Sequence, residues 1–186
     1  MIIRPAQSAD YPAILALQAQ NVPEHLSAEQ RRQGFIVSTM DEAQLARINA
    51  ALGILVAEAE GELAGFVCLT QANVQPRPEV VDAMLATLEP QRFDGRPINQ
   101  QRYFLYGPVC LAQRWRGKGV LKQLFAAVKA HTRASYDLGI LFIDDAKPHS
   151  LAAHQQGLGM TMVTTFSCRG KRYYLLAFAT RNAGYS

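Results

Sequence analysis

A short, basic, glycine-rich turn is the part of this sequence best suited to chemistry. Residues 114–125 read RWRGKGVLKQLF, so two closely spaced glycines lead straight into a segment whose apolar residues have helical spacing. Glycine has no Cβ and lets the backbone approach a ligand closely. The unpaired N–H groups and the dipole of a helix's first turn favour an anion at the same place. We therefore expect residues 116–121 to form a phosphate cradle.

Common phosphate motifs do not fit this turn. The Walker pattern needs four residues between its glycines, and the dinucleotide fingerprint needs a third glycine opening the chain's first helix. Here Gly117-Lys-Gly119 is followed by Leu121 and lies past the middle of the chain. The alternative interpretation is a strand-to-helix turn that needs glycine for its geometry alone.

An apolar strand is expected at 103–111, just before the turn. Pro108 has no N–H, so the strand cannot form a normal ladder there and is expected to bulge. The alternative is an edge strand that carries a proline and has no ligand.

Length and composition describe one globular domain. The 186 residues are 49% hydrophobic and 18% charged, which excludes disorder and allows a buried core. No apolar stretch approaches the roughly 18 residues that span a bilayer, and the first four residues resemble a strand rather than a signal peptide. The three cysteines are far apart in apolar runs, as expected for buried thiols of a cytoplasmic protein. The net charge of +4 would tolerate an anionic ligand without indicating nucleic acid.

Capping residues and apolar periodicity predict the first half of the chain. Ser8 is expected to cap the first helix, and Ser27-x-x-Gln30 and Asp41-x-x-Gln44 resemble capping boxes. The other elements expected here are a strand at 2–4, a helix ended by Gly53, and a hairpin of strands 54–58 and 63–69 around Glu60-Gly61.

The 71–101 segment is unusual because it holds four prolines around an amphipathic stretch at 80–88. Long loops inside compact domains tend to be functional. The segment could be a lid bordering a second substrate, a dimer surface that would make the protein a homodimer, or only a long excursion.

The second half follows a regular βαβ pattern. Gly139 is expected to end the helix that follows the glycine turn, and the apolar run 140–143 should be a buried strand parallel to 103–111. Ser150 is expected to cap a short helix at 151–156, and the chain ends in a hairpin of 161–167 and 171–178.

This order of elements resembles the GNAT family of N-acetyltransferases, most sharply over 104–178. The family's loop is Arg/Gln-x-x-Gly-x-Gly/Ala, and the present loop matches it except at Leu121, which replaces a small residue. The resemblance implies a single α+β domain with a mixed, bent sheet and helices on both faces. It also implies acetyl-coenzyme A as co-substrate, whose pyrophosphate would lie on Arg116, Gly117, Lys118, Gly119, Val120 and Leu121.

By the same resemblance, the backbone of Val109, Cys110 and Leu111 would bind the pantetheine amides. A backbone N–H near Val109 or Cys110 could also polarise the thioester carbonyl. The neighbouring thiol of Cys110 is expected to pack rather than attack, because it lies within a strand.

A second motif of the family maps onto 147–154. Lys147 stands where an asparagine usually contacts coenzyme A, Ser150 matches the family, and His154 stands where a tyrosine usually protonates the leaving thiolate. Histidine can deliver a proton near neutral pH, so His154 is the candidate general acid. Alternatively, His154 is a partly buried residue that packs on the helix face and has no catalytic role.

No general base stands out in the sequence. Asp144 and Asp145 end the predicted parallel strand, where they could face a ligand or simply cap and solvate the next turn. An ordered water could instead remove the amine proton.

We therefore expect an enzyme that moves an acetyl group from acetyl-coenzyme A directly to a primary amine of a small molecule or peptide, with no metal, membrane or nucleic acid. A second class is an acyl-coenzyme A sensor without turnover, which the substitutions at Lys147 and Leu121 and the missing base favour. A nucleic-acid-binding domain using Arg114, Arg116, Lys118 and Lys122 is a third class, but aromatic interleaving beyond Trp115 is lacking.

Overall fold

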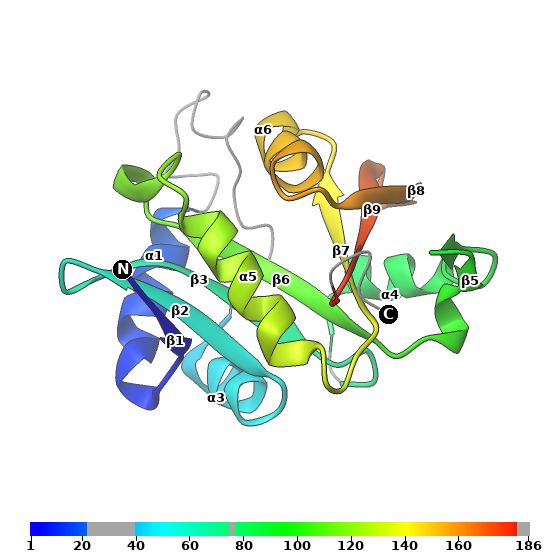
Figure 1. Ribbon diagram of the computed structural model, residues 1–186. Helices are drawn as coiled ribbons and strands as arrows, with labels where there is room; N and C mark the ends of the chain where they lie inside the picture. Colours follow the sequence, from blue (N-terminus) through cyan, green and yellow to red (C-terminus); the bar gives the residue numbers. More distant parts are fainter. Residues whose placement is uncertain (22–39, 75–76, 182–186) are drawn as a thin grey trace. The chain divides into compact units, whose positions relative to one another are not determined.

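A computed structural model describes residues 1–21, 40–74 and 77–181 of the chain. The chain forms two compact units. Unit 1 contains Met1–Thr70 and Tyr106–Val128, and unit 2 contains Gln71–Leu105 and the chain from Lys129 onward. The main sheet has seven strands in the order β1-β2-β3-β6-β7-β9-β8, and its strand β6 (Tyr103–Leu111) contributes residues to both units (Figure 1). The predicted α+β class with a mixed sheet is confirmed.

Unit 1 begins with an antiparallel arrangement of three strands. These are β1 (Ile2–Pro5), β2 (Gly53–Ala59) and β3 (Glu62–Thr70). The predicted hairpin turn between β2 and β3 is confirmed, with φ of 53° at Glu60 and 75° at Gly61. Both residues of the turn therefore adopt the left-handed region that tight hairpins require.

Two helices lie together beside these strands in Figure 1, α1 (Tyr11–Gln20) and α3 (Glu42–Ala50). The capping box of α3 is confirmed: Asp41 Oδ1 accepts from Gln44 N at 2.8 Å, and Gln44 Oε1 accepts from Asp41 N at 2.8 Å. The helix ends at Ala50, and Gly53 instead begins β2 with φ of 126°. The apolar residues that these elements bury together are Ala6, Tyr11, Ile14, Leu17, Leu45, Ile54, Val56, Phe66, Cys68 and Cys110.

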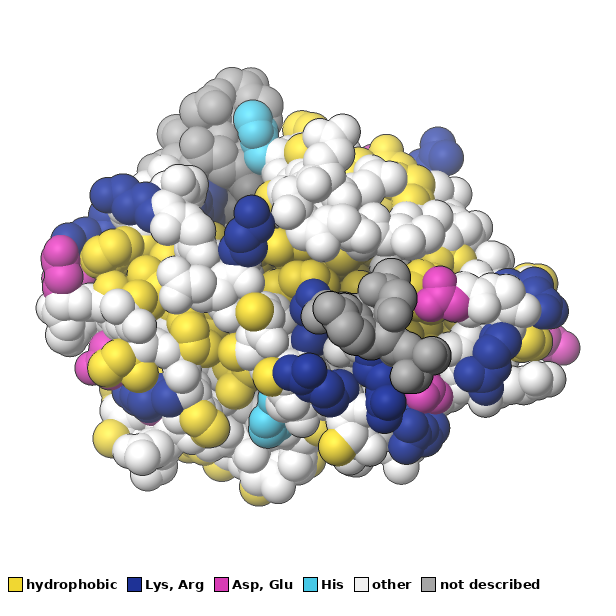
Figure 2. All heavy atoms as spheres, viewed as in Figure 1, with side chains coloured by type: hydrophobic (Ala, Val, Ile, Leu, Met, Phe, Trp, Pro, Cys, Tyr) yellow, Lys and Arg dark blue, Asp and Glu magenta, His cyan; other side chains and the backbone are white. Residues whose placement is uncertain are grey.

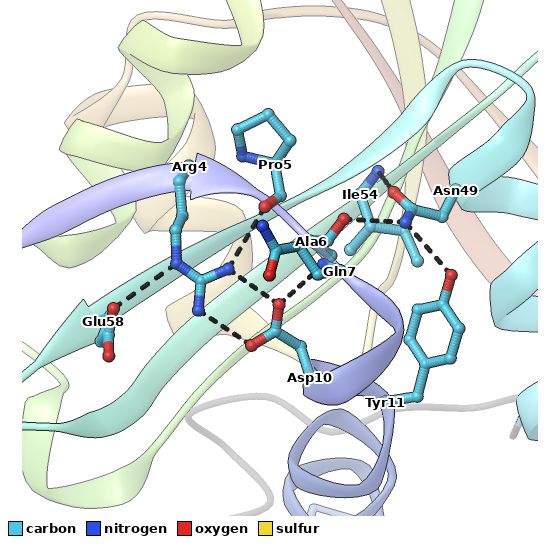
Figure 3. A network of polar contacts seen from close by, with 9 residues as sticks. All are labelled: Arg4, Pro5, Ala6, Gln7, Asp10, Tyr11, Asn49, Ile54 and Glu58. Atoms are coloured by element: carbon cyan, nitrogen blue, oxygen red, sulfur yellow. Dashed lines mark hydrogen bonds and ion pairs between the residues drawn. The ribbon is translucent and has the colours of Figure 1, made fainter.

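The prediction that Ser8 caps the first helix is wrong. Ser8 lies inside a short 3₁₀ turn, η1 (Ser8–Asp10), and Asp10 is the N-cap of α1. Asp10 is held by both terminal nitrogens of Arg4, at 2.8 and 2.9 Å, and accepts from the backbone N–H of Gln7 at 2.7 Å (Figure 3). Because these donors stabilise the carboxylate, the pKa of Asp10 lies below its ordinary value.

A second network in Figure 3 joins α1 to α3. The side-chain amide of Asn49 donates to the Tyr11 hydroxyl at 3.1 Å, and its oxygen accepts from the backbone N–H of Ile54 at 3.2 Å. Asn49 therefore ties the helix pair to the start of β2. The other predicted capping box, at residues 27–30, lies outside the described residues.

Unit 2 is built on strands β7 (Leu138–Asp144), β8 (Thr161–Cys168) and β9 (Lys171–Ala179). The βαβ prediction is confirmed, because β7 is parallel to β6, with Tyr103, Phe104 and Leu105 in register with Leu138, Gly139 and Ile140. The predicted final hairpin is also confirmed, with Arg169 and Gly170 at positive φ in its turn.

The proline-rich 71–101 segment contributes to the core of unit 2. It forms α4 (Glu79–Ala86), the two-residue strands β4 (Arg92–Phe93) and β5 (Arg96–Pro97), and the 3₁₀ turn η3 (Ile98–Gln100). Its buried apolar residues pack with those of the sheet in one cluster: Val80, Met84, Leu88, Phe93, Ile98, Leu105, Leu138, Ile140, Phe166, Tyr173, Leu175 and Ala177.

The prediction that Gly139 ends a helix is wrong. The helix after the glycine turn, α5 (Val120–Thr132), ends earlier, and Gly139 lies inside β7. A Cβ on Gly139 would come within 2.7 Å of Phe178 Cε1 and 2.9 Å of Phe104 Cζ. The glycine is therefore there to make room for two aromatic rings, whose centroids are 5.9 Å apart.

Ser150 is not a helix cap either. Helix α6 (Pro148–Ala152) has Lys147 as its N-cap and contains Ser150 in its middle, and a π-helical turn, η5 (Ala153–Gly157), continues it. Proline at the first helical position fits because its missing N–H would have had no partner there. This shift of the helix start moves Ser150 from a terminal to an internal position.

Candidate functional site

The glycine turn has the backbone conformation that an anion cradle requires. A 3₁₀ turn, η4 (Gln113–Trp115), leads to Gly117 and Gly119 with φ of 74° and 84°, and α5 begins at Val120. Both glycines are exposed, and a Cβ added to either would find no atom within 4 Å. Positive φ at an exposed turn that opens a 13-residue helix leaves room for a ligand at the helix's positive end.

Arg116, the first residue of the turn, is half-buried. Its Nη2 donates to Oδ1 of Asn21 at 2.7 Å. Burial lowers the pKa of the Arg116 guanidinium from its ordinary value. Arg116 therefore anchors the turn to the end of α1.

Figure 2 shows Lys and Arg side chains at several places on one face of the molecule. The other basic side chains near the glycine turn differ in their surroundings. Arg114 makes ion pairs with Glu60 at 2.7 Å and Glu62 at 3.0 Å, so its charge is already balanced. Its guanidinium and the Lys118 ammonium both lie over the Trp115 ring, 5.0 and 5.5 Å from the centroid. The exposed Lys118 is thus the cation best placed to meet an anion from solvent.

The indole N–H of Trp115 is buried and has no hydrogen-bond partner among the described residues. At the far end of the turn Val120 is almost completely buried, at 1% exposure, and Leu121 is half-buried. The side chains of Val120 and Leu121 are therefore wholly and partly buried where α5 begins.

Strand β6 offers backbone groups rather than a nucleophile. Val109 and Leu111 are half-buried, and Cys110 is buried with its thiol 3.9 Å from the Leu17 carbonyl oxygen. Burial raises the pKa of Cys110 to about 12, so the thiolate is not available near neutral pH. The predicted bulge at Pro108 stays a prediction, although the peptide before this proline is cis.

Lys147 is a half-buried cation at the start of α6. Burial and, to a smaller extent, the nearby Lys171 lower its pKa to about 8, while Asp144 raises it. Asp144 itself is buried; its Oδ1 accepts from the Ala146 N–H at 2.9 Å, and its Oδ2 lies 3.9 Å from Lys171 Nζ. These contacts support the capping interpretation of Asp144.

His154 is buried at 3% exposure in the π-helical turn. Its Nδ1 lies 2.8 Å from the backbone oxygen of Ser150, which can only accept, so Nδ1 carries a proton and Nε2 is the nitrogen that titrates. Burial lowers the pKa of His154 below its ordinary value, and the Ser150 contact opposes this only in part.

The sequence-predicted residues fall into two groups. Unit 1 holds Val109, Cys110, Leu111 and the whole 116–121 turn, and unit 2 holds Lys147, Ser150 and His154. Within the described residues no group of three or more metal-ligating side chains occurs. No helix in the described part of the chain is long and apolar enough to cross a membrane.

Sequence comparison assigns the family. The sequence model of the acetyltransferase (GNAT) family matches residues 17–160 and so covers most of the chain. The chain belongs to the GNAT family. No curated protein matches the sequence significantly.

Solved structures of GNAT proteins have the same fold. An N-acetyltransferase from Staphylococcus aureus Mu50 is 16% identical, with a TM-score of 0.63 over 97% of this chain and 98% of its own. A ribosomal-protein-alanine N-acetyltransferase from Brucella melitensis is 19% identical, with a TM-score of 0.62 over 96% and 99%. A phosphinothricin acetyltransferase from Sinorhizobium meliloti, solved in complex with acetyl-coenzyme A, is 17% identical, with a TM-score of 0.61 over 96% and 87%. At these identities the likeness shows the fold alone.

Sequence reasoning missed several residues that shape the loop of this GNAT protein. Asn21 holds Arg116, and Glu60 and Glu62 hold Arg114. Gly65 lets β3 approach β6 closely, since a Cβ there would lie 2.9 Å from the Cys110 carbonyl oxygen. The role of Asn21 had one local signal in the sequence, because asparagine is common at helix ends. The contacts of Glu60 and Gly65 had none, since they join residues more than 40 positions apart.

Proposed function

We propose that this GNAT protein is an acetyl-coenzyme A-dependent N-acetyltransferase that acts in the cytoplasm on a primary amine. The observation that carries the proposal is the open Gly117–Gly119 turn at the start of α5, within the region matched by the family. An added Cβ would occupy the open space on either glycine, which supports a ligand lying against the backbone there.

The cofactor site would be built mainly from backbone groups. The N–H groups from Gly117 to Leu121 would bind the pyrophosphate, with Lys118 adding an exposed charge. The backbone of Val109, Cys110 and Leu111 on β6 would bind the pantetheine amides. Lys147 and Ser150 complete the proposed set of cofactor-binding residues.

Catalysis would rest on positioning and on polarisation of a carbonyl. Bound acetyl-coenzyme A supplies an acetyl group activated as a thioester. A backbone N–H at Val109 or Cys110 would stabilise negative charge on the carbonyl oxygen, and the site would hold the amine for direct attack in a ternary complex. The raised pKa of Cys110 supports direct transfer over a covalent cysteine intermediate.

His154 is the proposed proton donor. Because Nδ1–H is committed to the Ser150 carbonyl, a proton would be delivered from Nε2 of the imidazolium. The lowered pKa of His154 makes the imidazolium the minor form at neutral pH, so its contribution should be greatest under acidic conditions.

Amine-dependent release of free thiol from acetyl-coenzyme A tests the proposal most simply. A panel of small-molecule and peptide amines should include acceptors that give thiol and acetylated product in equal amounts, as measured by mass spectrometry. Binding of acetyl-coenzyme A without amine-dependent release would support the sensor alternative, which the unusual Lys147 and Leu121 favour. Absence of any binding would reject both.

A further inference from the structure

Asn21, the residue that ends α1, is held in one orientation by hydrogen bonds. Its side-chain N–H donates to the Leu17 carbonyl at 2.8 Å, and its backbone N–H donates to the Gln18 carbonyl at 3.0 Å. With the amide nitrogen committed to Leu17, the amide oxygen is turned toward Arg116, whose Nη2 donates to it at 2.7 Å. Asn21 is only 5% exposed, so this arrangement is built into the interior of unit 1.

The glycine turn cannot fix its own conformation. Gly117 and Gly119 have no side chains, and nothing lies within 4 Å of the position of a Cβ on either. Such residues lose more conformational freedom on ordering than any others. The conformation of the turn therefore depends on its flanks, which are the buried Val120 on one side and the half-buried Arg116 on the other.

The Asn21–Arg116 contact joins an amide oxygen to a half-buried guanidinium. Hydrogen bonds to charged groups are stronger than those between neutral groups. Asn21 accepts from one donor of Arg116, and Glu60 and Glu62 hold the neighbouring Arg114 by ion pairs. The Asn21 contact thus helps to fix the direction of the Arg116 side chain at the start of the turn.

We propose that Asn21 is a positioning residue for coenzyme A binding and acts through Arg116. This inference rests on the proposed function, because it assumes that the turn binds coenzyme A. It predicts that Asn21 matters for affinity even though it belongs to a different helix from the turn and matches no loop motif.

Gln18, on the same helix end, provides a matched control. It is also 5% exposed, and its amide makes two hydrogen bonds to the backbone of Met40, at 2.9 and 3.0 Å. Gln18→Ala and Asn21→Ala each remove one buried amide from the last turn of α1. Only Asn21→Ala removes a contact with Arg116.

The test is calorimetric titration of coenzyme A into the purified full chain and its variants, after thermal melting has shown that each is folded. Asn21→Ala should weaken binding about tenfold, as for the loss of a hydrogen bond to a charged group. Gln18→Ala should stay within about twofold of wild type.

A double-mutant cycle tests whether Asn21 acts through Arg116. Arg116→Met and Asn21→Ala/Arg116→Met should bind coenzyme A equally within about twofold, because the second change has nothing left to remove. Additive losses of affinity, or wild-type affinity in Asn21→Ala, would overturn the inference.

Should Asn21→Ala not fold, Asn21→Ser takes its place in the cycle. If wild type itself binds no coenzyme A, the proposed function fails and this inference with it; wild-type binding with an unaffected Asn21 variant rejects this inference alone.

Discussion

The glycine turn of unit 1 and the 147–157 segment of unit 2 use opposite means to prepare a site. The turn is exposed and offers backbone N–H groups, with glycines that an added Cβ would not crowd. The 147–157 segment offers two side chains, Lys147 and His154, whose pKa values burial has lowered. The first depends on a backbone conformation that its flanking residues hold, and the second depends on the side chains packed around two buried groups. Mutations in the turn should therefore affect mainly ligand binding, and mutations in unit 2 should act through core packing as well.

Mutations that disturb core packing in unit 2 should have the largest effect on the protein. Trimming the 71–101 segment to a short turn would remove five buried residues of the apolar cluster in unit 2, so unit 2 should not fold. Met84→Ala alone should lower the free energy of unfolding by about 2–5 kcal/mol, against about 0.5 kcal/mol or less for the exposed Glu89→Ala. Urea denaturation measures both. Normal folding of the trimmed chain would mean that the segment is a separable lid.

His154→Phe should give the next largest effect. The change keeps bulk and removes the proton, so kcat should fall at least about 100-fold while acetyl-coenzyme A affinity stays nearly unchanged. His149→Phe, an exposed position on α6, is the matched control and should leave kcat within about twofold of wild type. A loss below threefold in His154→Phe would leave His154 as a packing residue.

The pH dependence sharpens this test. An acid catalyst is active when protonated, so kcat should decline as pH rises through the pKa of His154. Burial places that pKa below the ordinary 6.5, so the declining limb should lie on the acidic side of this value. His154→Phe should abolish the limb. A limb that survives in the variant would assign the proton to another residue.

The same contrast explains what the sequence could predict. The glycine turn, the preceding strand β6 and the two hairpins are predicted by residue types at short spacing, such as Glu60-Gly61 and Gly117-Lys-Gly119. All of these elements are present in the structure. Gly139 and Ser150 were assigned wrongly because their roles depend on distant packing: the rings of Phe104 and Phe178 for the glycine, and Lys147 as N-cap for the helix. The Asn21–Arg116 contact spans 95 positions and could not be inferred from spacing.

The two kinds of glycine should also respond differently to substitution. Gly139→Ala would force a methyl group against Phe178 and Phe104 and should destabilise the fold by about 1–3 kcal/mol. Gly157→Ala is the matched control in the same unit, since its nearest atom to an added Cβ is 3.9 Å away. Chemical denaturation of the two variants compares them. Equal stability would contradict the close packing assigned to Gly139.

Coenzyme A titration of Gly119→Val tests most directly whether the open turn is a phosphate cradle. The valine strains the positive φ of 84° and fills the space where the pyrophosphate should lie. Gly170→Val, at φ of 77° in the β8–β9 turn with equally open surroundings, imposes the same strain away from the loop. We predict that Gly119→Val weakens coenzyme A binding at least about tenfold, or 1.4 kcal/mol, while Gly170→Val stays within about twofold. Wild-type affinity in a folded Gly119→Val protein would contradict the assignment of the turn as the cofactor site.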